Sequence, residues 1–159
     1  MNTNNSSNNS TLLLFDSSMS FTDVFLIIKE KNPQIITFDY ESHILLKKKD
    51  ISHEISDSYT TTHDLEYIQE QSYLFSKWFN ESKISHLIYF EDINLGELFF
   101  SDFHYQLIPI LKKIFEVKKI FESNKNSTFV TSNVLYKIIF SLTNLIIKLE
   151  SNSQKIIDY

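Results

Sequence analysis

The sequence predicts a three-layer α/β fold in which a parallel sheet carries a long helical insertion. Three short runs, 11–15, 34–38 and 126–131, have the length of strands, and the second is apolar enough to be buried on both faces. Between the first two runs, apolar residues recur at helical spacing, and strands that alternate with helices are typical of a parallel sheet. The predicted strand order is 3-2-1-4, where strand 4 is residues 126–131.

The segment 34–59 organises this expected fold as strand, helix and strand. Asp39 follows the strand 34–38, and its carboxylate can accept hydrogen bonds from the free N–H groups of a helix start. Lys47–Lys49 place positive charge at the negative end of that helix. Residues 51–56 then form the next strand, so the segment is a parallel βαβ unit.

The first part of the chain begins with a polar tail, residues 1–10, which is expected to be disordered because it offers nothing to bury. The strand 11–15 follows, and Ser20 with Asp23 fits a capping box at the start of a helix. Asn32-Pro33 ends this helix, because a residue before proline avoids the helical region.

The pattern becomes helical after Tyr59. A second capping box is expected from Thr61 and Asp64, and the helix behind it is apolar over so much of its circumference that packing on more than one side is expected. Residues 84–90 fit a strand or a helix equally well. A helix is expected over 97–121, with a kink at Pro109, and a last helix over 134–150, capped by Ser132 or Asn133. Residues 151–159 form a ragged end.

Composition limits the classes of function. The 159 residues suit a single domain, 11–150, and the scattered lysines with a net charge of -5 argue against a nucleic-acid surface. The absence of cysteine excludes disulfides and thiolate metal sites, and no metal site is expected. No apolar run is long enough to span a membrane and no signal peptide is evident, so a cytoplasmic location is expected.

Gly96 is the only glycine of the chain. A dinucleotide fingerprint or a Walker loop needs several glycines for close approach of the backbone to phosphate, so both are excluded and no cofactor is expected.

Ligands of open α/β sheets bind beyond the carboxyl ends of the strands, where helices begin. A carboxylate at this edge could act as a general base, but the same residue types also cap helices, and both interpretations stay open. The edge is expected to be built by Asp16, Ser17, Ser18, Asp39, Tyr40, Asp57, Tyr59, Ser132 and Asn133.

Other candidate groups have a structural interpretation beside the functional one. His43, His53 and His63 lie ten residues apart, which does not match zinc-ligand spacing, so they are expected to be unrelated. Trp78, with its aromatic neighbours, could stack on a sugar or belong to the core. The lysines of 112–119 could form a basic patch or a solvated helix face.

The segments LLLFDSS, IITFDYESHILLKKKDISHEISDSY, INLGELF and STFVTS, in this order, resemble the N-terminal part of certain surface-carbohydrate biosynthesis proteins that look like GT-B glycosyltransferases. The resemblance covers about residues 11–150 and implies a Rossmann-like domain on the acceptor side of a two-domain enzyme. It also implies that a C-terminal donor-binding domain, or a separate subunit, is needed, and that the chain is inactive alone. No family catalytic motif is matched, so no catalytic residue is carried over.

The alternative function is a non-catalytic protein-interaction module with a Rossmann-like fold. Its exposed apolar helix faces would then dock on a partner.

Overall fold

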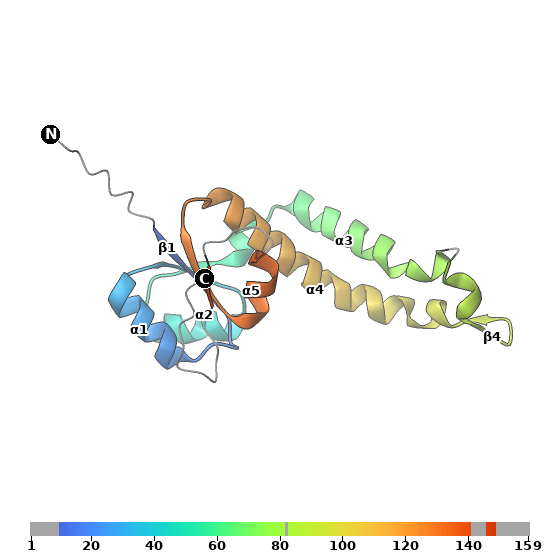
Figure 1. The fold of residues 1–159 in the computed structure, drawn as a ribbon, viewed down its shortest axis with the longest axis horizontal. Coiled ribbons are helices and arrows are strands. Elements are labelled where there is room, and N and C mark those ends of the chain that lie inside the picture. The colour runs from blue at the N-terminus through green and yellow to red at the C-terminus, as the bar shows by residue number, and fades with distance from the viewer. Residues whose placement is uncertain (1–9, 82, 141–145, 149–159) are drawn as a thin grey trace. The chain divides into compact units, whose positions relative to one another are not determined.

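The computed structural model describes residues 10–81, 83–140 and the backbone of 146–148. The chain divides into two compact units, one formed by Met1–Tyr59 with Val117–Tyr159 and the other by Thr60–Glu116. Figure 1 shows a sheet with helices in the first unit and a pair of helices in the second. The predicted tail 1–10 lies outside the described residues except for Ser10, as does the ragged end 151–159.

The first unit, called the Rossmann-like unit below, contains a five-stranded sheet of order β3-β2-β1-β6-β7 in which every described pairing is parallel. The predicted order 3-2-1-4 is confirmed, with β6 as the fourth strand and β7 beyond it. The strands are β1 (Thr11–Phe15), β2 (Gln34–Thr37), β3 (Glu54–Ile55), β6 (Thr128–Thr131) and β7 (Ile146–Lys148).

The end of the chain differs from the prediction. The last helix, α5 (Asn133–Ile139), is short, and residues 146–148 form strand β7 beside β6. The prediction of one helix over 134–150 is therefore wrong. An apolar run of this length fits a helix or a buried strand equally well by periodicity, and pairing with β6 decides for the strand.

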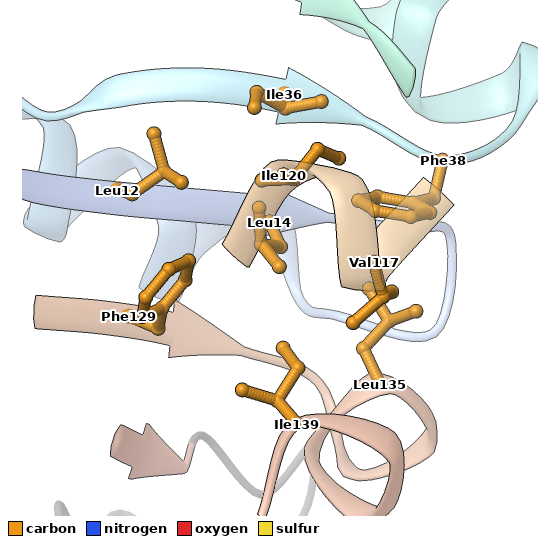
Figure 2. Close-up of a cluster of buried hydrophobic side chains, with 9 residues drawn as sticks. All are labelled: Leu12, Leu14, Ile36, Phe38, Val117, Ile120, Phe129, Leu135 and Ile139. Atoms are coloured by element: carbon orange, nitrogen blue, oxygen red, sulfur yellow. The ribbon is translucent and has the colours of Figure 1, made fainter. Parts of the chain in front are cut away.

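Both faces of the sheet are covered, which gives the three layers. Leu13 of β1 pairs in register with Ile35 of β2 and Val130 of β6, and all three side chains are buried beneath α1 (Phe21–Lys31) and α2 (Tyr40–Lys47). Side chains alternate along a strand, so the neighbouring positions point to the opposite face. There they form the cluster of Figure 2, where residues of α4 (Leu95–Ser123) and α5 cover the strands: Leu12, Leu14, Ile36, Phe38, Val117, Ile120, Phe129, Leu135 and Ile139.

The helix starts of this unit are capped as expected in two of three cases. Asp39 accepts a hydrogen bond from the Ser42 N–H at the start of α2, and Ser132 caps α5 through the Leu135 N–H. Ser20 is the N-cap residue of α1, but its side chain makes no capping hydrogen bond, so the predicted capping box with Asp23 is wrong.

The second unit, called the helical unit below, contains α3 (Thr62–Ser76) and α4 up to Glu116. The capping box of Thr61 and Asp64 is confirmed, and α4 covers the predicted helix 97–121 with Pro109 inside it. The ambiguous segment 84–90 becomes a 3₁₀ turn (Ser85–Leu87) and strand β4 (Tyr89–Phe90), which pairs antiparallel with β5 (Ile93–Asn94).

The two helices lie side by side and antiparallel (Figure 1). The hydroxyl of Ser72 on α3 donates a 2.9 Å hydrogen bond to the carbonyl oxygen of His104 on α4. The same hydroxyl oxygen lies 2.9 Å from the Nδ1 atom of His104, within hydrogen-bonding distance. Gly96 lies at the start of α4, where an added Cβ would overlap the side chain of buried Phe79. The glycine therefore serves close packing rather than phosphate binding.

The helical unit buries few apolar side chains among its described residues. Ile68 and Phe79 are buried, whereas many large apolar side chains of α3 and α4 are exposed. The expectation that the first of these helices packs on more than one side is wrong for Tyr67, Leu74 and Phe75, which are exposed. None of the described helices is both long enough and apolar enough to cross a bilayer.

Candidate functional site at the carboxyl edge of the sheet

The parallel sheet brings the predicted site residues to one edge, because the carboxyl ends of parallel strands lie at the same side. Asp16 directly follows β1, Asp39 lies two residues after β2, Asp57 two residues after β3, and Ser132 directly follows β6. The structure places these residues in two clusters, one around Asp16 and one around Asp39.

The Asp16 cluster joins the ends of β1 and β6. Asp16 is buried, and its Oδ2 atom accepts a 2.7 Å hydrogen bond from the Ser132 hydroxyl. Its Oδ1 atom accepts hydrogen bonds from the backbone N–H, at 3.1 Å, and the hydroxyl of Ser18. Because Asp16 is buried and both of its carboxylate oxygens accept hydrogen bonds from groups of the chain itself, this cluster has a structural role. Asn133 is the first residue of α5, and its side chain is exposed and forms no described hydrogen bond with the Asp16 cluster.

The Asp39 carboxylate connects the loop after β1 to the start of α2. Its Oδ2 atom accepts a 2.7 Å hydrogen bond from the Ser17 N–H, and its Oδ1 atom accepts one of 2.8 Å from the Ser42 N–H. Partial burial raises the pKa of Asp39, but the hydrogen bonds from Ser17 and Ser42 lower it by more, so the pKa lies below its usual value of 3.8. Asp39 is therefore an anion at neutral pH.

A pocket of about 310 Å³ opens beside Asp39, at the carboxyl ends of β2 and β3. Asp39, Tyr40 and Asp57, three of the predicted site residues, line it together, and the Tyr40 side chain is 77% exposed. The pocket thus combines an accessible aromatic ring with two carboxylates. Its full lining is Phe38, Asp39, Tyr40, His43, Ile55, Ser56 and Asp57.

His43, which the sequence did not single out for this site, also lines the pocket and is paired with His53. Nδ1 of His43 lies 2.8 Å from Nε2 of His53, and Nδ1 of His53 lies 2.7 Å from the carbonyl oxygen of Ile51. The expectation that these histidines are unrelated is therefore wrong for this pair. His63 is part of the helical unit.

The carbonyl group fixes the tautomers of the neutral pair. A carbonyl oxygen only accepts, so Nδ1 of His53 carries its proton and Nε2 of His53 accepts. Nδ1 of His43 must then donate, which leaves the lone pair on its Nε2 atom. The lining of the pocket therefore includes an imidazole whose Nε2 atom carries the lone pair in this tautomer.

Tyr59, the remaining predicted residue, faces a different group. Its hydroxyl donates a 2.7 Å hydrogen bond to Oε2 of Glu54, and burial together with this carboxylate raises the pKa of Tyr59 to about 12. Tyr59 therefore stays protonated at neutral pH and anchors the segment after β3.

A second hollow, of about 330 Å³, lies in the helical unit and includes Trp78 and Lys77 in its lining. Trp78 and Tyr73 are exposed, whereas Phe79 is buried, so the expected aromatic group is divided between surface and core. Lys112 forms a 2.7 Å ion pair with the buried Glu116 one turn away, so this lysine belongs to neither a free basic patch nor a fully solvated helix face. No group of three or more His, Asp or Glu side chains in the described part of the chain could hold a metal ion.

The fold and this edge define a three-layer, Rossmann-like α/β protein with a helical insertion. Comparison of the chain with protein-family models, with curated proteins and with solved structures finds no match.

Proposed function

We propose that the Rossmann-like unit binds a carbohydrate in the pocket beside Asp39, as the acceptor-side domain of a GT-B-like glycosyltransferase of surface polysaccharide biosynthesis. The single observation that carries the proposal is the composition of this pocket at the carboxyl edge of the sheet. An exposed tyrosine ring suits the apolar face of a sugar, and carboxylates suit its hydroxyl groups.

In this proposal, three groups have separate roles. Tyr40 supplies the stacking surface, and Asp39, held as an anion by two backbone N–H groups, accepts a hydrogen bond from a sugar hydroxyl. His43 accepts the proton of the attacking hydroxyl on Nε2, because its Nδ1 atom donates to His53. The nucleotide-sugar donor would be held by a second domain or a separate subunit, so the proposal expects no transfer by this chain alone.

Saccharide binding to the labelled protein, followed by NMR, tests the proposal. A panel of neutral and acidic saccharides is titrated, and saturable shifts are expected at residues 38–43 and 55–57. Tyr40→Ala removes the stacking ring and should weaken binding by up to about tenfold. Tyr105→Ala is the matched control, because Tyr105 is also an exposed tyrosine, 70% accessible, but lies in the helical unit.

The proposal fails if no saccharide gives saturable shifts in the pocket, or if the Tyr105 variant loses as much affinity as the Tyr40 variant.

A non-catalytic interaction module is the second candidate, and the β4–β5 hairpin favours it. Tyr89, Phe90 and Ile93 are exposed on this hairpin, with Glu91 and Asp92 at positive φ in the turn between the strands. Tyrosine is enriched among the residues that dominate protein–protein binding. Tyr89→Ser with Phe90→Ser should then abolish partner capture while the saccharide-induced shifts stay unchanged.

A further inference from the structure

Helix α4 carries an exposed apolar stripe that α3 does not cover. At 3.6 residues per turn, Phe99, Phe103, Ile110 and Ile114 lie within a sector of about 60° on the helix, with Leu95 beside them. Their side chains are 39% to 63% exposed. The ring contacts with Tyr73 of α3 come instead from Phe100 and His104, which lie on the neighbouring sector.

The spacing of the stripe is symmetric along the helix. The intervals are four residues from Phe99 to Phe103, seven to Ile110 and four to Ile114, so the pattern reads the same in both directions about a point between positions 106 and 107. An antiparallel copy of α4 with a two-fold axis at this point would set Phe99 against Ile114 of the other copy and Phe103 against Ile110. A self-complementary patch is what a two-fold symmetric interface requires.

The charges beside the stripe lie close to the same symmetry, because Asp102 and Lys113 are centred between positions 107 and 108, one residue from the centre of the stripe. Asp102 and Lys113 lie eleven residues apart, about three turns, so both stand on one edge of the stripe. In an antiparallel pair, groups on one edge of a helix face the same edge of the partner. Asp102 of each copy would therefore approach Lys113 of the other, and the pairing would form two attractive contacts and no like-charge contact between these groups.

The apolar area is also sufficient. The five residues of the stripe expose roughly 400 Å² of side-chain surface per copy, taking about 150–200 Å² for a large side chain. A specific interface buries about 800 Å² per partner, of which about 450 Å² is non-polar. The stripe alone supplies most of this non-polar area, and the helical unit buries little of its own.

From this symmetry, charge pattern and area, we propose that the chain forms a homodimer in which α4 packs antiparallel against α4 of a second copy. With α3 of each copy alongside, the four helices make a bundle whose interior contains the stripe. The dimer does not depend on the pocket beside Asp39.

Crosslinking at the two-fold axis tests the proposed register, since the natural chain has no cysteine. In the dimer, the two copies of position 106 are offset by about 1.5 Å along the helix, whereas the two copies of position 102 are about 13 Å apart. A disulfide needs Cα atoms within about 7 Å. Gln106→Cys should therefore crosslink under mild oxidation, and the control Asp102→Cys should not, at a concentration at which sedimentation shows the Asp102→Cys variant to be a dimer.

Sedimentation of the full chain measures the association itself. The natural protein should have twice the monomer mass of 18.8 kDa at micromolar concentration. Phe99→Glu should give a monomer, and Asp102→Lys or Lys113→Asp should each raise the dimer dissociation constant about tenfold. The double charge exchange should restore the natural affinity, which a variant that merely misfolds cannot do.

A monomer mass at all concentrations would overturn the proposal, and so would equal crosslinking at positions 102 and 106, which indicates another register. A monomer that instead binds phosphatidylcholine vesicles through Phe99 would also overturn it, since the stripe would then face lipid.

Discussion

The Ser132 hydroxyl donates a 2.7 Å hydrogen bond to Oδ2 of Asp16, across 116 positions of the chain. Both residues are buried, and each follows a central strand of the sheet. The bond therefore fixes the ends of β1 and β6 relative to each other, while the same serine caps α5 through the Leu135 N–H.

We expect Asp16→Ala to lower the free energy of unfolding by about 1.5–3 kcal/mol, because it leaves the buried hydroxyl of Ser132 without its acceptor. Urea denaturation followed by circular dichroism measures this change. Saccharide binding in the pocket should persist in this variant at low urea. Lost binding with unchanged stability would instead place Asp16 in the ligand site.

Ser132→Ala and Ser20→Ala compare a serine that caps its helix and also bonds Asp16 with a serine for which no capping hydrogen bond is formed. Both serines are N-cap residues, but only Ser132 makes the capping hydrogen bond. We expect Ser132→Ala to cost about 1–2 kcal/mol and Ser20→Ala to be close to neutral. Equal losses in urea denaturation would contradict the difference between the two helix starts.

Thr131→Val should leave stability unchanged or raise it. The Thr131 hydroxyl is buried, and no hydrogen-bond partner for it lies among the described residues. Replacing a buried, unpaired hydroxyl by a methyl group of similar size removes a desolvation cost. A loss above about 1 kcal/mol in the same denaturation assay would show that the hydroxyl has a partner in the folded protein.

Gly96→Ala should destabilise the helical unit, because the new Cβ overlaps Phe79. The gain of about 1 kcal/mol in helix propensity is smaller than the cost of overpacking at so close an approach. The test is thermal unfolding of the single variants and of the double variant Gly96→Ala with Phe79→Ala. In the Phe79→Ala background the added methyl group should cost nothing, and a persistent cost would exclude this clash as the cause.

The lowered pKa of Asp39 predicts a pH dependence of stability. A carboxyl whose pKa is lower in the folded protein stabilises the fold above its unfolded pKa, near 3.8, and this contribution is lost as the pH falls through the folded value. We expect Asp39→Asn to reduce the slope of stability against pH below about pH 4. Identical slopes for the variant and the natural protein would mean that the pKa of Asp39 is the same in the folded and the unfolded protein.

Much of the fold can be predicted because the sheet centre is encoded locally. Leu12–Phe15 and Ile35–Thr37 are continuous buried runs, and Asp39 begins a helix by a hydrogen bond to Ser42, three residues later. Strand β3 is shorter than the predicted 51–56, because Ile51 instead ends the turn after α2, with its N–H bonded to the Leu46 carbonyl.

The residues of the site could be predicted only where their position at the carboxyl ends of the strands is enough to place them there. The rule for the carboxyl edge found Asp39, Tyr40 and Asp57 in the pocket, but it also selected Asp16 and Ser132, whose polar groups are used internally. The His43–His53 pair depends on the turn between α2 and β3, which reverses the chain over ten residues. No spacing rule for metal sites describes such a pair, so the ten-residue interval in the sequence does not by itself predict the contact.

The shortness of β3 bears on how the protein avoids misassembly. This outermost strand offers only Glu54 and Ile55 for pairing, and the Glu54 side chain is held by Gln34 and Tyr59. A two-residue edge that carries a fixed charge is a poor template for an incoming strand. Strand addition is therefore disfavoured on this side of the sheet, and we expect unfolded copies not to be recruited there even at high protein concentration.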